Sequence, residues 1–240
     1  MSMIVPSYRK DYVGETINRI IDGKTVSQFI KPKFDAFTKS NVMSAIVLGN
    51  GITRNYPEHK NLLRINSRRL AQSYKLVYAC NRAIHEEETY DYYVLKHKVF
   101  LARVAQERKP QVYLPNNIFL EFGKYTEYNM IPFVSYLDSG ASAAMLAAFD
   151  GHKKIFLFGF DGDLGKGWQT LYDDTFPYNE NKVDPSLNDW KKHMCEVMSA
   201  YKDTNFYRIQ SEGQQAPAEW RQLPNFKDVS VREAVLLGDF

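Results

Sequence analysis

From residue 44 onward, short apolar runs alternate with longer segments whose apolar residues recur at helical spacing. The runs that we expect to be strands are Ala45–Leu48, Leu76–Cys80, Tyr90–Leu95, Val112–Leu114, Lys154–Phe158 and Phe206–Ile209. The segments that we expect to be helices are Asn61–Ser73, Val99–Arg108, Gly140–Phe149 and Leu187–Ala200. Because repeated strand–helix units of this length form parallel sheets, the pattern predicts a Rossmann-like α/β fold with helices on both faces of the sheet.

The first 43 residues carry a different pattern. Their apolar positions give a rough helical stripe, made up of Ile17, Ile20, Ile21, Val26 and Ile30. Lys31-Pro32-Lys33 then interrupts the stripe, since proline breaks a helix. We therefore predict a helical extension over residues 1–43, serving as a cap or an oligomer contact, and one Rossmann-like domain over residues 44–240.

Polar residues cluster where the predicted strands end. Gly49-Asn50-Gly51, Asn81-Arg82 and Lys96-His97 follow the first three strands. Asp138-Ser139-Gly140 opens the small-residue helix, and Gly159–Asp163 follows the next strand. The carboxyl ends of parallel strands share one edge of the sheet, and ligands of such folds bind there. The sequence therefore predicts a polar binding site at this edge.

Two of these junctions have more than one interpretation. In Gly49-Asn50-Gly51, glycine lets the backbone approach a ligand, and the Asn50 amide can bond a sugar hydroxyl or a phosphate oxygen. The same residues also suit a plain tight turn. Ser139 is a natural N-cap, which either completes a simple helix start or leaves N–H groups for a phosphate. The charge of Asp138 opposes an anion there.

Asp161 and Asp163 lie two residues apart, just past a strand. Such a pair can hold Mg²⁺ or Mn²⁺ and, through the metal, a diphosphate. It can also contact a ribose, position an acceptor hydroxyl, or form a solvated turn. The long connection from Gly159 to Pro185 suits a lid or a surface loop. Within it, Tyr172 can donate a hydrogen bond to a departing phosphate.

The histidines form no familiar catalytic arrangement. The sequence indicates no Ser-His-Asp or Cys-His set and contains no Walker-type phosphate loop. His85 and His97 lie at the edge where the site is expected, and histidine is the side chain suited to proton transfer near neutral pH. We expect His152 to lie at the opposite edge, and His193 to pack or be solvated within the last long helix.

The composition narrows the class of protein. Apolar residues make up 44% of the 240 residues and charged residues 25%, as in an ordinary globular protein. The net charge of +3 is lower than a dedicated nucleic-acid-binding protein carries. Cys80 and Cys195 have no metal-ligand spacing and are expected to be free thiols. No apolar run approaches the roughly 20 residues that span a bilayer, and no secretory signal is visible. We therefore expect a cytoplasmic protein.

Together these segments resemble a known family. The stretches "VLGNG", "YACN" and "SGASAAMLAAFDGHKKIFLFGFD" are similar to those of the bacterial sialyltransferases that decorate surface glycans. They also resemble a related family around an archaeal-type hydroxymethylpterin pyrophosphokinase (MptE-like). The resemblance covers residues 45–163, about half the chain. It implies a glycosyltransferase-A-like domain that binds a nucleotide sugar.

The resemblance also implies roles for individual residues. It implies that the nucleotide or donor sugar contacts Asn50, Asn81, Ser139, Gly140 and Asp161. We add their neighbours Gly49, Gly51 and Arg82 to the predicted donor-binding site. The sialyltransferases use CMP-linked donors and no metal, a tyrosine pair that steadies the leaving phosphate, and a histidine as the proposed base. In this chain Asp163 stands at the first tyrosine position and Tyr172 supplies the second. The segment from Asn179 to Leu187 contains no histidine, so our candidates for the base are Asp163 and His85.

The favoured function is transfer of a sugar from a nucleotide-activated donor to a hydroxyl acceptor, with no cofactor required. A glycan is the expected acceptor. A nucleic acid with hydroxylated bases is the alternative, motivated by the basic residues Arg64, Arg68, Arg69, Lys96, Lys98, Arg103, Arg108 and Lys109. The rival enzyme is a Mg²⁺-dependent pyrophosphokinase acting on a small alcohol, with Asp161 and Asp163 as metal ligands. The rival outside catalysis is a nucleotide-binding protein that has lost its activity.

Overall fold

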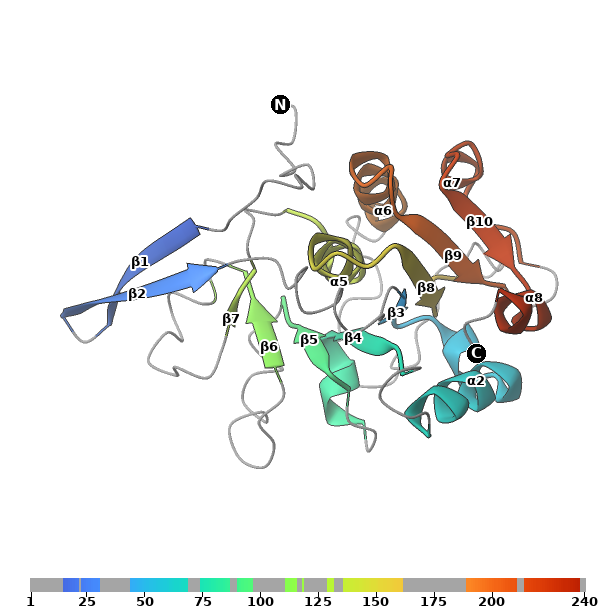
Figure 1. Ribbon diagram of the computed structural model, residues 1–240, viewed down its shortest axis with the longest axis horizontal. Helices are drawn as coiled ribbons and strands as arrows, with labels where there is room; N and C mark the ends of the chain where they lie inside the picture. Colours follow the sequence, from blue (N-terminus) through green and yellow to red (C-terminus); the bar gives the residue numbers. More distant parts are fainter. Residues whose placement is uncertain are drawn as a thin grey trace.

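The parallel sheet predicted from the sequence is present. The computed structural model describes residues 15–21, 23–30, 44–68, 74–86, 90–96, 111–115, 118, 129–131, 136–161, 189–210 and 214–237. Its main sheet has the order β10-β9-β8-β3-β4-β5-β6-β7, and every neighbouring pair is parallel (Figure 1). The strands are β3 (Ser44–Leu48), β4 (Leu76–Cys80), β5 (Tyr92–Val94), β6 (Gln111–Leu114), β7 (Asn129–Met130), β8 (Lys154–Phe158), β9 (Asn205–Ile209) and β10 (Phe226–Val229).

All six predicted strands are confirmed, and the structure adds β7 and β10. The sequence analysis missed β7 because it is only two residues long. It missed β10 because Lys227 and Asp228 interrupt the apolar pattern of the strand. β10 lies at the edge of the sheet, where one side of a strand stays unpaired and polar residues are tolerated.

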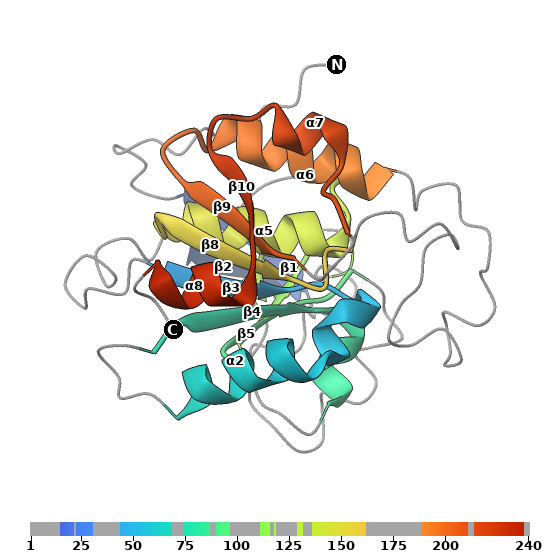
Figure 2. The ribbon, with the colours of Figure 1, turned by 90° about the vertical axis from the view of Figure 1, so that its right-hand side faces the viewer.

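Helices cover both faces of the sheet, as predicted. One face packs against α5 (Ser139–Phe149), α6 (Asp189–Ala200) and α7 (Ala218–Arg221), and the other packs against α2 (Pro57–Ser67) and α8 (Val231–Leu236). Figure 2 shows α6 and α7 on one side of the sheet and α2 on the other. Alternate side chains of a strand serve the two faces: in β3, Val47 lies in the core beneath α5, while Leu48 lies in the core beneath α2.

α5 is the most deeply buried helix of those described. Every residue from Ser139 to Phe149 is buried, and the helix packs against α6 and the strands β3 to β5. Its small alanine side chains let α5 lie close to both α6 and the sheet. A helix that is apolar all round belongs in the core.

The predicted helix Asn61–Ser73 differs from the structure at both ends, because α2 ends at Ser67. Two other predicted helices lie partly or wholly outside the described residues. α2 begins at Pro57, four residues before the predicted start, because Pro57 occupies its first turn, where the missing N–H costs nothing. α6 is described from Asp189, and the predicted residues 187 and 188 lie outside the described part. The predicted helix Val99–Arg108 also lies outside the described residues.

The predicted N-terminal helix is wrong where the structure describes it. Residues Glu15–Ile21 and Lys24–Ile30 form the antiparallel strands β1 and β2, in a sheet of their own. Ile21 pairs with Lys24 at the end of the two strands, and Gly23 has a φ of 75°. In the sequence, the pair Asp22-Gly23 between Ile21 and Lys24 is a strong hairpin signal, which the spacing of the isoleucines concealed. The domain boundary at residues 43 and 44 stays a prediction.

The strand order places the predicted site at a reversal of the fold. From β3 the chain runs outward through β4 to β7, returns through α5 to β8 on the other side of β3, and continues through β9 to β10. The carboxyl ends of β3 and β8 therefore flank the switch point, where ligands of open α/β sheets bind. Among the described helices, none has the length and apolarity needed to cross a membrane.

Candidate functional site

The loops after β3 and β8 interlock at the switch point. The backbone N–H of Gly49 donates to the carbonyl of Phe158 at 2.8 Å, and the N–H of Gly51 donates to the carbonyl of Gly159 at 2.9 Å. A Cβ atom on either Gly49 or Gly51 would lie 2.5 Å from the Gly159 oxygen. Gly159 itself has a φ of 68°, which favours glycine. The glycines of the Gly-Asn-Gly turn are thus required by the neighbouring loop of the protein itself.

Asp161 joins these loops to the short 3-10 helix Ile52–Asn55. Its Oδ2 accepts a hydrogen bond from the backbone N–H of Thr53 at 3.0 Å, and its Oδ1 accepts one from the Thr53 hydroxyl. Burial raises the pKa of Asp161, and the two bonds from Thr53 and the charge of Arg208 oppose that shift. Both carboxylate oxygens therefore hold the architecture of the turn. Contact between Asp161 and a nucleotide stays a prediction.

A buried ion pair anchors the loop after β8 from the opposite side. The guanidinium of Arg208 on β9 is 2% exposed; its Nε donates to Asp228 Oδ1 at 2.6 Å and its Nη2 to Asp228 Oδ2 at 3.1 Å. Nη1 also donates to the carbonyl of Phe160 at 3.2 Å. The sequence analysis missed this pair. The available signal was one arginine inside an apolar strand, since a charge is rarely buried without a partner.

Asn50 is held between the ends of β3 and β4. The thiol of Cys80 donates to the carbonyl of Leu48 at 3.3 Å, and its sulfur lies 3.8 Å from Asn50 Oδ1. Burial raises the pKa of Cys80 to about 12, so the thiol stays protonated and acts as a donor. Cys80 and Cys195 are free, as predicted. Asn50 itself is half-buried, at the centre of the predicted binding edge.

A buried cation that the sequence analysis did not single out lies on the same side of the site. Arg54, 4% exposed, forms an ion pair with Glu86, which also accepts a hydrogen bond from the Tyr90 hydroxyl at 2.8 Å. The charge of Arg54 acts on Cys80, where it opposes the rise in the thiol pKa. The ion pair of Arg54 and Glu86 therefore lies close to the end of β4, and the charges of its two partners act on Cys80 in opposite directions.

Asn81 joins the end of β4 to the end of β5. Its side-chain Oδ1 accepts from the backbone N–H of Lys96 at 3.1 Å, and its φ is 46°, a left-handed value that asparagine tolerates better than most residues. Asn81 begins the 3-10 helix Asn81–His85. Arg82 and His85 belong to this helix by their backbone, but their side chains lie outside the description. The predicted roles of Arg82 and His85 stay predictions.

Asp138, and not the predicted Ser139, is the N-cap of α5. Asp138 Oδ1 accepts from the backbone N–H of Gly140 at 2.8 Å and from that of Ala141 at 3.0 Å, while Ser139 is the first helical residue. The Asp138 carboxylate accepts from two backbone N–H groups at once, which is why Asp138 caps the helix in place of the Ser139 hydroxyl. It occupies N–H groups that a phosphate would use, and it places negative charge there.

The N-terminus of α5 packs directly on the switch point. A Cβ atom on Gly140 would lie 3.0 Å from Cε1 of Phe160, in the loop after β8. Glycine at this position therefore lets α5 approach that loop. The contact brings Asp138 and Ser139 to the same edge as Asn50 and Asn81, as the sequence predicted.

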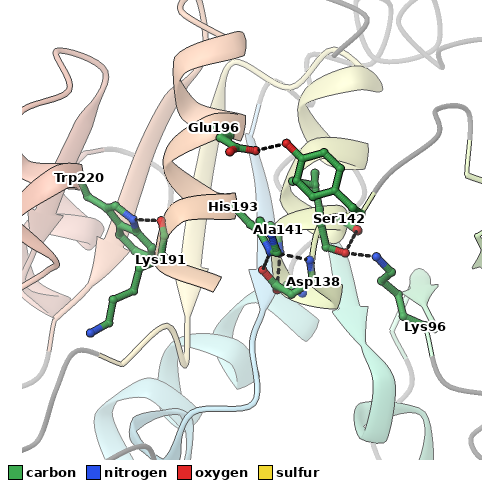
Figure 3. Close-up of polar contacts among 11 residues, drawn as sticks. Lys96, Asp138, Ala141, Ser142, Lys191, His193, Glu196 and Trp220 are labelled. Atoms are coloured by element: carbon green, nitrogen blue, oxygen red, sulfur yellow. Dashed lines mark hydrogen bonds and ion pairs between the residues drawn. The ribbon is translucent and has the colours of Figure 1, made fainter. Parts of the chain in front are cut away.

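Two side chains contact the start of α5 from opposite sides: Lys96 contacts Leu137, and His193 contacts Asp138 (Figure 3). The Lys96 ammonium donates to the carbonyl of Leu137, and burial lowers its pKa while the charge of Asp138 opposes that shift. Nδ1 of His193 on α6 accepts a hydrogen bond from the Asp138 backbone N–H at 3.1 Å and lies 3.3 Å from Asp138 Oδ2. The sequence analysis expected His193 to pack or be solvated. Its position beside the buried Met194 and Val197 was the signal that it borders the core.

His152 and His59, the other histidines whose side chains are described, are packed within the protein. His152 lies at the opposite edge of the sheet, as predicted, and its Nε2 is 3.1 Å from the buried Tyr78 hydroxyl. His59 of α2 is fully buried against Phe158, with ring centroids 5.8 Å apart. Burial lowers the pKa of His59, and the charges of Glu58 and Asp161 oppose that shift.

The catalytic candidates Asp163 and Tyr172 lie outside the described residues. His97, predicted to lie at the same edge, is also outside them. In the part of the chain that is described, no group of three or more His, Cys, Asp or Glu side chains is placed to hold a metal ion. A metal site built from Asp161 and Asp163 therefore stays a prediction. Both oxygens of Asp161 already have partners on Thr53.

Fold and site define a Rossmann-like α/β protein with a polar site at its topological switch point. No model of a known protein family matches the chain, and no curated protein matches it. Among solved structures, the chain is similar to the monofunctional alpha-2,3-sialyltransferase Cst-I from Campylobacter jejuni. The two are 18% identical, the match covers 72% of this chain and 77% of that one, and the TM-score is 0.47.

Proposed function

We propose that the protein is a glycosyltransferase that moves a sugar from a nucleotide-activated donor to a hydroxyl acceptor. One observation carries the proposal. The separate segments that resemble the sialyltransferase motifs converge at the switch point of a parallel sheet, where Gly49–Gly51, Asn81, Ser139–Gly140 and Gly159–Asp161 lie at one edge. Such an edge is where open α/β sheets bind nucleotides.

The charges at this edge favour one orientation of the donor. Arg54 lies near Cys80 within its ion pair with Glu86, whereas Asp138 places negative charge at the start of α5. A nucleotide phosphate is an anion and is repelled by the carboxylate. We therefore place the nucleotide over Asn50 and Asn81, with its sugar directed toward Ser139, and the acceptor hydroxyl on the side of Asp138.

The chemistry follows from this orientation. A base takes the proton of the acceptor hydroxyl while its oxygen bonds to the anomeric carbon, and the bond from that carbon to the phosphate oxygen breaks. Hydrogen-bond donors stabilise the phosphate as it leaves. Arg82 and Tyr172 are the proposed donors, and Asp163 and His85 are the bases proposed from the sequence. No metal takes part in this scheme.

A binding screen tests the proposal. We would record the melting temperature with CMP, UMP, CMP-sialic acid, UDP-glucose, UDP-N-acetylglucosamine and ATP, each in EDTA and in Mg²⁺ or Mn²⁺. A nucleotide at a hundred times its dissociation constant adds about 2.7 kcal/mol of apparent stability. We expect a nucleotide sugar to stabilise the protein in EDTA and to release its nucleotide when an acceptor glycan is added.

The same screen separates the alternatives. If ATP is the only nucleotide that stabilises the protein, and does so only with Mg²⁺, the result would support a pyrophosphokinase instead of a glycosyltransferase. Binding without release of nucleotide from any donor would favour the inactive nucleotide-binding protein. A steep salt dependence of binding to DNA would favour a nucleic-acid acceptor over a glycan.

A further inference from the structure

We infer that the exposed ring of Tyr136 is the stacking platform for an uncharged sugar of the acceptor, and that the carboxylates of Glu196 and Asp138 beside it disfavour anionic acceptors. The inference rests on the proposed function and deepens it, because it names the class of acceptor and a residue that selects it. Tyr136 lies two residues before Asp138, on the side of the site where the acceptor hydroxyl is placed.

Tyr136 differs from the tyrosines of the neighbouring strands in its exposure. The tyrosines of β4, β5 and β6 are buried in the core, whereas Tyr136 is 56% exposed. A single exposed apolar residue is common on protein surfaces. Tyr136 is distinguished by the two contacts that hold its ring and by the charged groups around it.

The ring of Tyr136 is held before any ligand binds. Its hydroxyl donates to Oε2 of Glu196 at 2.7 Å, and its ring packs against the His193 imidazole, with centroids 5.5 Å apart and planes at 65°. The hydrogen bond to Glu196 raises the pKa of Tyr136, so the hydroxyl stays a donor. An aromatic side chain that is already fixed loses little conformational entropy when a ligand stacks on it.

Carboxylate oxygens lie next to this ring. Glu196, His193 and Asp138 follow one another on the side of α6 that faces α5 (Figure 3). Asp138 is 31% exposed, so its carboxylate is reachable from solvent. A pyranose ring has an apolar face of C–H groups and a rim of hydroxyl donors. The Tyr136 ring suits that face, and the carboxylates are acceptors for the hydroxyls.

The same carboxylates disfavour an acceptor that carries negative charge. Of the lysines in this region, Lys96 donates to a backbone carbonyl, Lys191 places its ammonium over the Trp190 ring at 5.9 Å from the centroid, and Lys192 is exposed on α6. A nucleic-acid site combines its stacking side chains with basic groups that contact the phosphates. An aromatic ring that is bonded to one carboxylate and lies close to another therefore fits a neutral sugar better than a nucleic acid.

Saturation-transfer NMR of the full chain measures sugar binding without any transfer reaction. The probes are methyl β-galactoside, methyl β-glucoside and the anionic methyl β-glucuronide at millimolar concentration, each alone and with CMP or UMP. We expect the neutral glycosides to bind more tightly than the glucuronide. Their affinity should fall about tenfold in Tyr136→Ala, because the aromatic contact is lost. Tyr136→Phe keeps the ring and should retain most of the binding.

Tyr56→Ala is the matched control for this measurement. Tyr56 is also exposed, at 36%, but it precedes α2 on the opposite face of the sheet. Its replacement should leave the affinity for the glycosides unchanged. If a nucleotide sugar reacts in the screen, Tyr136→Ala should also raise the KM for the acceptor about tenfold, with the donor affinity and the melting temperature retained.

Glu196→Gln separates the effect of charge from the effect of stacking. The amide oxygen still accepts from the Tyr136 hydroxyl, so the ring stays in place while the negative charge is removed. We expect the affinity for the glucuronide to rise about two- to fivefold, the size of an exposed charge interaction. The affinity for the neutral glycosides should stay the same.

The outcomes distinguish this inference from the proposed function. The platform is overturned if the wild type binds no glycoside with or without nucleotide, or if Tyr136→Ala binds the glycosides as the wild type does. Binding of single-stranded oligothymidine that is lost in Tyr136→Ala would assign the ring to a nucleic acid and overturn it too. Equal affinity for the glucuronide and the neutral glycosides would overturn the selection by charge. A chain that binds no nucleotide in the screen would instead overturn the proposed function, and binding of glycosides through Tyr136 would still establish the sugar site.

Discussion

At the scale of single residues, the site consists of side chains that hold each other as well as side chains that can hold a ligand. Asp161 is bonded to Thr53, and the glycines of the Gly-Asn-Gly turn face the loop after β8. Asn50 between those glycines is half-buried, and its Oδ1 lies 3.8 Å from the Cys80 sulfur. The glycines of this turn serve the architecture, and contact between Asn50 and a ligand stays a prediction.

Asn50→Ala tests the ligand side of this division. The substitution removes one polar group from a half-buried position, so the free energy of unfolding should change by about 1 kcal/mol or less. Nucleotide binding should weaken by roughly 1–3 kcal/mol, because a polar group of the ligand loses its partner. Titration calorimetry and thermal melts measure the two effects, with the exposed Asn61→Ala as control. A large drop in melting temperature with unchanged affinity would show that Asn50 is structural.

Gly51→Ala tests the architectural side. The new Cβ would lie 2.5 Å from both the Asp161 carboxylate and the Gly159 oxygen, so the interlocked loops must move apart. We expect a loss of roughly 1–3 kcal/mol in unfolding free energy, the usual cost of overpacking. Gly23→Ala is the control: no atom lies within 4 Å of its Cβ, and only the strain of its φ of 75° remains. A denaturant titration in which Gly51→Ala is as stable as the wild type would contradict the interlocked arrangement.

At the scale of elements, β8, β9 and β10 are tied together beneath the site by Arg208 and Asp228. The guanidinium contacts Asp228 of β10 and the carbonyls of Phe160 and Gln214, and Asp228 also accepts from the backbone N–H of Ala216 at 2.9 Å. One buried cation thus connects two strands and the loop that carries Asp161. The local sequence of β10 did not reveal this strand, because Asp228 serves Arg208 on β9 and Lys227 is paired with Glu233 of α8.

Removing one partner of the Arg208–Asp228 ion pair should lower the free energy of unfolding more than removing both partners. Asp228→Asn leaves a buried guanidinium without a counter-charge, for which we expect a loss of about 3–5 kcal/mol in unfolding free energy. Replacing both partners, in Arg208→Met with Asp228→Leu, should recover a large part of that loss, since apolar residues of similar volume need no counter-charge. Urea titrations of the two single variants and the double variant measure this. Strictly additive losses would mean that the pair is not coupled.

At the scale of the whole molecule, the eight-stranded sheet and the hairpin β1–β2 are separate sheets. Every strand pairing of the hairpin is internal, whereas the main sheet pairs from β10 through to β7 without a break. The switch point lies between β3 and β8, both inside the predicted domain of residues 44–240. The hairpin therefore contributes no strand to the sheet that carries the site.

Removal of residues 1–43 tests this separation. The remaining chain keeps all eight strands of the main sheet and both cores, so we expect one cooperative thermal transition and unchanged nucleotide affinity. Light scattering of both forms would show in addition whether the N-terminal segment mediates an oligomer, the role predicted for it as an alternative to a cap. An unfolded truncation would place the domain boundary before residue 44.

The sequence alone determined the layered architecture and the edge that carries the site. Burial of strands on both faces produces continuous apolar runs such as Ala45–Leu48, and parallel strands necessarily end at a common edge, so a local pattern is sufficient for both conclusions. The hairpin was misassigned because isoleucine spacing fits two periodicities, and the turn signal of Asp22-Gly23 outweighs the stripe.

Only the tertiary structure decided which residues at that edge meet. The requirement for glycine at positions 49 and 51 comes from a loop more than a hundred residues away in the chain, and so does the partner of Thr53. Whether Asp138 or Ser139 caps α5, and whether His193 is an ordinary helical residue or the neighbour of that cap, depends on how α5 and α6 pack. Such contacts join residues that no local periodicity connects, because they are set by the packing of whole elements.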